Sequence, residues 1–186
     1  VAAPGQSLLI AEPLNGIEIL VESGSAGATS VSAAMQAIAD AGVEHLRSVR
    51  LGFQRLGVET VIDGADLLVP AEQEMRIRSD LGGAVPKLED QPWPAFPADV
   101  MSIAIVTATQ CEGIILMHVK MFESRVFFVD QLVGMGARIV LCDPHRALVH
   151  GPARLRGEPS GIPSPDIRAG IALLIAALCA DGRTVI

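Results

Sequence analysis

The sequence is poor in aromatic residues, which make up 3% of its 186 residues, with no tyrosine and one tryptophan. Such a chain offers few rings on which nucleic-acid bases could stack. It also has fewer basic residues (14) than acidic ones (21), and its formal net charge at pH 7 is −7. This balance disfavours binding to a phosphate backbone, so we expect no nucleic-acid partner. A few arginines could still converge on a small anion, because net charge does not describe a single pocket.

Cysteines and long apolar runs are scarce as well. The three cysteines, Cys111, Cys142 and Cys179, form no CxxC pair, and an odd, small number is typical of reduced thiols in the cytosol. The longest apolar stretch, residues 169–180, is shorter than the roughly 20 residues that span a bilayer. The first ten residues lack the basic-then-apolar order of a signal peptide. We therefore expect a cytoplasmic globular protein with no membrane partner.

No motif for a metal or a nucleotide cofactor stands out. Cys142, Asp143 and His145 are close in sequence, but Asp-Pro is ordinary in turns and a metal would need further ligands. Gly134 and Gly136 follow a predicted helix and precede a predicted strand, which reverses the order of a dinucleotide-binding loop. We predict no metal site and no cofactor.

What the sequence does contain is an alternation of helix and strand patterns. Apolar periodicity predicts helices at 30–41, 45–56, 126–135 and 167–180, and another directly after Asp99. Strands are predicted at 7–11, 16–21, 74–77, 113–118 and 184–186, and hairpins at 58–62/67–70 and 138–142/147–150. Half of the residues are apolar, which is enough for a sizeable core.

Two of these patterns occur twice. The segments FQRLGVETVIDGADLLVP and LVGMGARIVLCDPHRALVHGP share one order of features. In each, a helix end is followed by a glycine, a strand, a turn, a second strand and a proline. The segments FPADVMSIAIVTATQCEG and PSPDIRAGIALLIAALCADG share a second order: a proline, an aspartate, an apolar helix, a cysteine and a glycine. The repeats predict a single α/β domain over residues 1–186, built from helix–strand–helix–hairpin units with the helices inside and the sheets outside.

Charged residues at the predicted helix starts have two interpretations each. Asp99 and Asp166 would cap apolar helices by accepting backbone N–H groups, but a carboxylate there could also accept a proton from a substrate hydroxyl. Arg125 and Arg168 open helices, where the helix dipole gives an arginine no advantage. Bidentate binding of an anion would explain the two arginines, and so would simple solvation. The residues alone leave both questions open.

Three long segments around these residues resemble the C-terminal half of the UDP-N-acetylglucosamine 1-carboxyvinyltransferases, a family of enolpyruvyl transferases. The segments are PWPAFPADVMS, MFESRVFFVDQLVGMGARI and SPDIRAGIALLIAALCADGRTVI. The resemblance is specific from about residue 44 to residue 186 and looser over 1–43, where ESGSAGAT replaces an acidic segment of the family. It implies an inside-out α/β fold of two domains with three repeats each, of which this chain is the second.

The resemblance also implies a function, the transfer of enolpyruvate from phosphoenolpyruvate to the 3-hydroxyl of UDP-N-acetylglucosamine in peptidoglycan synthesis. Asp99 then corresponds to the base for the sugar hydroxyl, and Met121 and Phe122 lie where the uridine packs. The remaining substrate-binding candidates, which face the cleft between the domains, are Arg125, Asp166 and Arg168.

On this mapping the family's lysine, loop cysteine and other phosphate-binding arginines belong to a missing N-terminal domain. We therefore expect that domain as a partner, an isolated chain without activity, and structural roles for all three cysteines. Two alternatives remain, an enolpyruvylshikimate phosphate synthase-like domain and a non-catalytic binding module of the same fold. The FESR and WPAFPAD motifs favour the nucleotide-sugar enzyme over the first alternative.

Overall fold

A computed structural model describes residues 6–11, 18–23, 36–70, 73–122 and 125–186. Its strands are β1 (Gln6–Ala11), β2 (Glu18–Ser23), β3 (Gln36–Ile38), β4 (Val61–Asp63), β5 (Asp66–Val69), β6 (Lys87–Glu89), β7 (Gly113–His118), β8 (Arg138–Asp143), β9 (Arg146–Gly151) and β10 (Gly182–Val185). Its α-helices are α1 (Arg47–Arg55), α2 (Met101–Gln110), α3 (Val129–Gly134) and α4 (Ile167–Cys179). Two short 3₁₀ turns are η1 (Leu81–Gly83) and η2 (Ala98–Val100).

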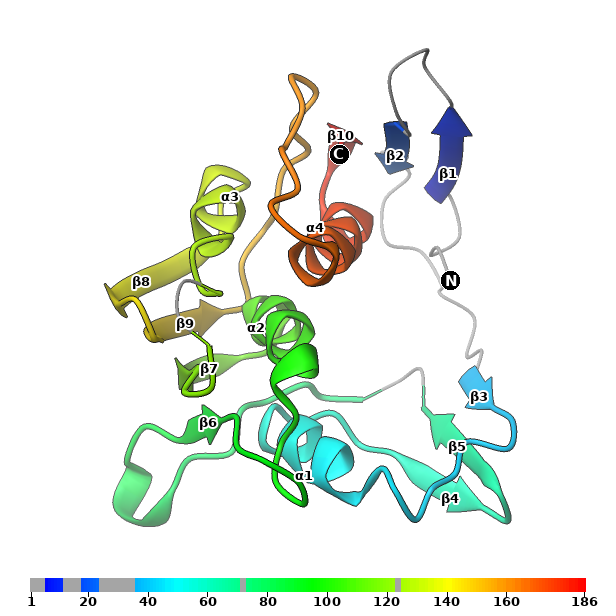
Figure 1. The fold of residues 1–186 in the computed structure, drawn as a ribbon, viewed down its shortest axis with the longest axis vertical. Helices are drawn as coiled ribbons and strands as arrows, with labels where there is room; N and C mark the ends of the chain where they lie inside the picture. The colour runs from blue at the N-terminus through cyan, green and yellow to red at the C-terminus, as the bar shows by residue number, and fades with distance from the viewer. Residues whose placement is uncertain (1–5, 12–17, 24–35, 71–72, 123–124) are drawn as a thin grey trace.

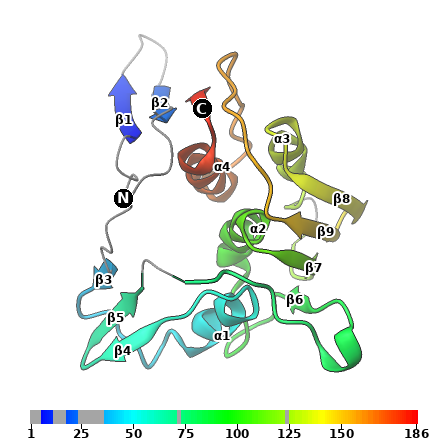
Figure 2. The ribbon, with the colours of Figure 1, turned by 180° about the vertical axis from the view of Figure 1, so that it is seen from behind.

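Within the described residues the strands form three sheets, in the orders β1-β2-β10, β3-β5-β4 and β6-β7-β9-β8. All neighbouring strands in them are antiparallel except β6 and β7, which are parallel. Helices α2 and α4 contact each other in the middle of the molecule, and the sheets lie around them (Figure 1). The view from behind gives the same layering (Figure 2). The predicted α/β arrangement, helices inside and sheets outside, is confirmed.

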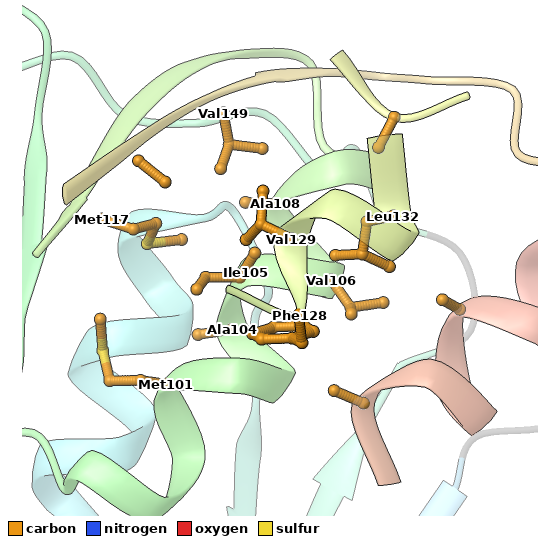
Figure 3. Close-up of a cluster of buried hydrophobic side chains, with 14 of the residues drawn as sticks. Met101, Ala104, Ile105, Val106, Ala108, Met117, Phe128, Val129, Leu132 and Val149 are labelled. Atoms are coloured by element: carbon orange, nitrogen blue, oxygen red, sulfur yellow. The ribbon is translucent and has the colours of Figure 1, made fainter. Parts of the chain in front are cut away.

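The two central helices are buried because they are apolar on nearly all sides. In α2 the buried side chains include Met101, Ala104 and Ile105, and Phe128 lies against this helix in the close-up of the core (Figure 3). Helix α4 buries mostly alanines, whose small side chains let the two helices approach closely. No helix in the described part of the chain has the length and apolarity required to cross a membrane.

The internal repeat is visible in the order of the elements. Helix α1 is followed by the hairpin β4–β5, and α3 is followed by the hairpin β8–β9. Gly57 and Gly136 link helix to strand at equivalent places, with φ angles of 84° and 102° that favour glycine. In the same way α2 leads into β7, and α4 leads into β10. The predicted repetition of helix, strand and hairpin is therefore confirmed for these units.

One predicted helix is wrong where it can be compared. Residues 36–41 of the predicted helix 30–41 contain β3, which pairs with β5 through Gln36–Val69 and Ile38–Leu67, while residues 30–35 lie outside the described residues. Asp40 and Gly42 have positive φ angles of 47° and 57°, which end any helical path there. The pairing of β3 with β5 decides the conformation, and the local sequence pattern gives no information about this pairing.

Smaller differences concern short elements. The predicted strand at 74–77 is reduced to a single bridge between Arg76 and Glu112. The predicted helix at 126–135 begins only at Val129, because the preceding residues form turns. Strand β6 was not predicted, since its three residues gain their conformation from pairing with β7.

The crossing of β9 over the end of α2 gives a testable consequence. A Cβ atom on Gly151 would collide with the carbonyl oxygens of Cys111 and Ala108, whereas one on the exposed, helical Gly134 would meet open space. We expect Gly151→Ala to lower the free energy of unfolding by about 1–3 kcal/mol, as overpacking does. Gly134→Ala should raise it by roughly 0.5–1 kcal/mol, because alanine is the better helix former. Urea titrations of both variants would measure this, and equal effects would contradict the close approach.

Candidate active site

Asp99 lies in the 3₁₀ turn η2, directly before α2, and not at the cap position. The residue at the N-cap of α2 is Val100, and neither η2 nor α2 receives a hydrogen bond from a capping side chain. The interpretation of Asp99 as an N-cap is therefore wrong. Its carboxylate turns instead toward two guanidinium groups, which are stronger partners for an anion than single amides.

The two partners of Asp99 are Arg168 and Arg125. The Nε of Arg168 donates to Oδ1 of Asp99 at 2.5 Å, and Nη1 of Arg125 donates to the same oxygen at 3.3 Å. Arg168 lies 69 residues further along the chain and is brought here by the contact between α2 and α4. The hydroxyl of Ser102 in α2 adds a bond to the carbonyl oxygen of Arg168 at 3.3 Å.

Asp166 does cap its helix, which is one of the two interpretations that the sequence leaves open. Its Oδ1 accepts hydrogen bonds from the backbone N–H groups of Arg168 at 2.7 Å and Ala169 at 3.1 Å. Since these amides belong to the first turn of α4, the cap fixes the backbone from which the Arg168 side chain extends toward Asp99.

Arg125 does not open a helix, contrary to the prediction, because α3 begins four residues later. Its guanidinium lies over the ring of Phe122, 3.6 Å from the ring centre, in a cation–π contact. Met121 and Phe122 are themselves 43% and 42% exposed. Five of the six predicted site residues (Asp99, Phe122, Arg125, Asp166 and Arg168) thus form one connected cluster, and Met121 adjoins it in sequence.

The charges of this cluster keep Asp99 ionised. The Arg168 guanidinium, with a smaller contribution from Arg125, lowers the pKa of the Asp99 carboxyl below its ordinary value of 3.8, although partial burial opposes the shift. The carboxylate is therefore a hydrogen-bond acceptor at neutral pH. It remains exposed to solvent, with 64% of its side-chain surface accessible.

The cluster does not enclose a ligand-sized pocket. A crevice beside it, between the starts of α2 and α4, is lined by Arg125, Asp166 and Arg168 but has a volume of only about 10 Å³. That is room for roughly one water molecule. The candidate residues therefore form an open surface, on which a larger ligand would be covered on one side only.

The cysteines and the Cys142–His145 segment are separate from this cluster. Cys111 is buried, and burial raises the pKa of its thiol to about 11, so it is inert packing as predicted. Cys142 and Cys179 are exposed, although desolvation raises the pKa of the Cys179 thiol. The predicted structural role of these two side chains stays a prediction. Among the described residues, no three or more His, Cys, Asp or Glu side chains are grouped so that they could hold a metal ion.

A second charged cluster lies beside the segment that carries Met121, and the sequence does not reveal it. Oε2 of Glu89 lies 2.6 Å from the Lys87 ammonium and 2.9 Å from that of Lys120, while Oε1 accepts a hydrogen bond from Gln91 at 2.7 Å. The two lysines, Lys87 above all, lower the pKa of Glu89 from 4.5 to about 2. Asp90, the next residue, is fully buried and bonded to backbone amides. The role of Asp90 and the pairing of Glu89 with Lys120 could not be recognised from sequence, because Lys120 and Met121 are about thirty residues away.

Similarity to known proteins assigns the chain to a family. The family model described as EPSP synthase (3-phosphoshikimate 1-carboxyvinyltransferase) matches residues 10–186, and the chain belongs to this family. A UDP-N-acetylglucosamine 1-carboxyvinyltransferase of Bradyrhizobium diazoefficiens is 64% identical over 167 residues, which are 89% of this chain and 38% of the relative. The enzyme of the same name from Treponema denticola is 47% identical over 195 aligned positions, covering 100% of this chain and 45% of the relative. The chain thus spans about two-fifths of the length of these relatives.

A solved structure agrees at the level of the fold. The enolpyruvyl transferase NikO from Streptomyces tendae superimposes with a TM-score of 0.68 at 22% sequence identity, over 81% of this chain and 34% of that one. The chain therefore has the mixed α/β fold of the enolpyruvyl transferases.

The Glu89 cluster predicts a specific dependence of stability on pH. Because the folded-state pKa lies below the ordinary value, the ion pairs stabilise the fold above pH 4.5 and lose this effect as the pH falls toward 2. We expect Glu89→Gln to lower the free energy of unfolding at pH 7, and the difference from the wild type to shrink below pH 4.5. Glu112→Gln, which breaks an exposed pair with Arg76, should have little effect at any pH. Urea titrations at a series of pH values would measure both differences, and a Glu89 difference independent of pH would contradict the assignment.

Proposed function

We propose that this chain forms one of two catalytic domains of an enolpyruvyl transferase whose acceptor is the 3-hydroxyl of UDP-N-acetylglucosamine. The donor is phosphoenolpyruvate, and the product serves peptidoglycan synthesis in the cytoplasm. The observation that supports this most is the 64% identity to an enzyme of that name, over nearly nine-tenths of the chain. The clustering of Asp99 with Arg125 and Arg168 supports it independently.

In the proposed reaction Asp99 accepts the proton of the sugar hydroxyl. Its carboxylate is ionised and exposed at the start of α2, so it can reach a ligand that lies on the open surface. The hydroxyl oxygen adds to the central carbon of phosphoenolpyruvate while its methylene carbon takes up a proton. Loss of that proton and cleavage of the bond from the central carbon to the phosphate oxygen then restore the double bond and release phosphate. The low pKa makes Asp99 a weak base while the arginines hold it, and an anionic ligand that draws them away would strengthen it.

The arginines are proposed to bind the anionic groups of the substrates. Arg168 uses Nε on Asp99, and a guanidinium has five N–H donors, so others remain for a phosphate or carboxylate. The Arg125 guanidinium lies over the ring of Phe122, and this contact orients the guanidinium plane. Met121 and Phe122 offer exposed apolar surface on which a nucleotide base can pack.

The proposed enzyme needs a second domain. The open surface around Asp99 would let water reach the reacting atoms, and closure of two domains over the substrates excludes it. We therefore propose that residues 1–186 form one domain and that the remaining length of the relatives supplies the other. The cysteine, lysine and further arginines expected for donor binding would belong to that part.

A first test concerns the chain alone. We expect it to fold and to release no phosphate from a mixture of phosphoenolpyruvate and UDP-N-acetylglucosamine, because half of the site is absent. The matched control is the complete enzyme that contains this chain, which should release phosphate with this acceptor and not with 3-phosphoshikimate. Release only with 3-phosphoshikimate would favour the other activity of the family, and release with neither would favour a binding module.

A second test concerns Asp99 in the complete enzyme. Asp99→Asn keeps the shape and removes the base, so kcat should fall by about 10²–10⁴-fold, the usual contribution of general base catalysis. The melting temperature should barely move, because exposed ion pairs contribute little to stability. Asp166→Asn serves as the comparison, since asparagine is also a good N-cap, and should reduce kcat far less. Near-normal kcat for Asp99→Asn would exclude the general-base role.

A further inference from the structure

Asp90 is a buried acidic residue that the proposed reaction does not use. It follows β6 directly, and its side chain has no exposed surface. Its Oδ1 accepts a hydrogen bond from the backbone N–H of Lys120 at 2.5 Å, and its Oδ2 accepts one from that of Met121 at 3.4 Å. Burial of a carboxylate is costly unless such donors compensate for lost water, so packing alone does not account for an aspartate here.

The segment that Asp90 binds is also held from the opposite side. The N–H of Val119 donates to the carbonyl oxygen of His145 at 2.8 Å, and Nδ1 of the His145 ring lies 2.9 Å from the carbonyl oxygen of Val119. The ammonium of Lys120 is in turn paired with Glu89 at 2.9 Å. Three successive residues, 119 to 121, therefore have their backbone fixed by the end of β6 and the β8–β9 turn.

The fixed segment ends at the exposed pair Met121 and Phe122. The ring of Phe122 lies under the Arg125 guanidinium, which reaches Asp99 at 3.3 Å. A continuous series of contacts thus runs from the buried Asp90 carboxylate through the 119–122 backbone to the proposed base. A shift of that backbone would move the ring and release the arginine from its orientation.

We propose that Asp90 is a positioning residue for the nucleotide-sugar acceptor, acting by setting the position of Met121 and Phe122. The inference rests on the proposed function, which supplies the acceptor. Asp90 touches neither substrate in this role. It acts through the two amides, and loss of these bonds weakens acceptor binding more than donor binding.

The test uses the complete enzyme with Asp90→Asn and Asp90→Ala. The asparagine variant keeps the volume and one acceptor oxygen, whereas alanine leaves both amides without a partner. We expect KM for UDP-N-acetylglucosamine to rise roughly tenfold in Asp90→Ala and by less in Asp90→Asn, as the loss of one buried hydrogen-bond partner predicts. KM for phosphoenolpyruvate should change by less than about twofold, because the changed segment carries the acceptor contacts.

Glu158→Gln is the matched control. Glu158 also accepts a hydrogen bond from a backbone N–H, that of Ser160, in a turn outside the cluster, and this variant should leave both KM values unchanged. If Asp90→Ala does not fold, Asp90→Asn decides, and amide hydrogen exchange at Lys120 and Met121 should be faster in it than in the control.

The outcomes separate the two proposals. A wild-type enzyme that does not use UDP-N-acetylglucosamine overturns the proposed function and this inference with it. An active wild type whose Asp90 variants change both KM values equally, or only lose folded protein, overturns the inference and leaves the proposed function in place. A selective and graded rise in acceptor KM supports both.

Discussion

The contact between α2 and α4 is the interaction on which the rest of the structure depends. Both helices are short, apolar on most sides and rich in small side chains, so neither could be stable in water without the other. Their packing places the two helix starts next to each other, although 69 residues of sequence separate Asp99 from Arg168. The same contact that completes the core therefore also assembles the charged cluster, and a change that separated the helices would remove both.

The internal repeat explains why two similar helix starts have different tasks. Each follows a proline and an aspartate, and from sequence both aspartates are reasonable caps. Asp166 remains a cap and thereby holds the backbone of Arg168. Asp99 precedes its helix by a 3₁₀ turn, so its carboxylate is displaced from the amides of α2 and turns to the arginines. A small local difference between two copies of one unit thus separates a carboxylate bound to backbone amides from one bound to exposed guanidinium groups.

The elements that the local pattern predicts well are those whose own pattern is long enough to be recognised without knowledge of the partner. Strand β7, helix α4 and the hairpin β8–β9 are of this kind, and they agree with the prediction within a few residues. Strands β3 and β6 have three residues each and gain their conformation from distant partners. The sequence pattern therefore predicts a helix where β3 lies and no element where β6 lies. The same holds within the site. Asp99 and Arg168 could be found from their motifs, whereas the role of Asp90 depends on backbone amides of another strand end, which no side-chain pattern reveals.

Asp90 and Asp99 make two kinds of polar contact, which differ in how readily a ligand can replace them. Asp90 itself is fully buried, so breaking its hydrogen bonds from backbone amides leaves a buried polar group without a partner. The ion pairs of Asp99 are exposed on one side, where such pairs contribute little and a competing anion can take over the arginine. An anion that competes for Arg125 and Arg168 would therefore change the partners of the arginines without breaking the buried hydrogen bonds beneath them. If the carboxylate of Asp99 is to be released only when an anion binds, two conditions are needed. The arginines must be able to change partners, and the backbone that Asp90 holds must stay rigid.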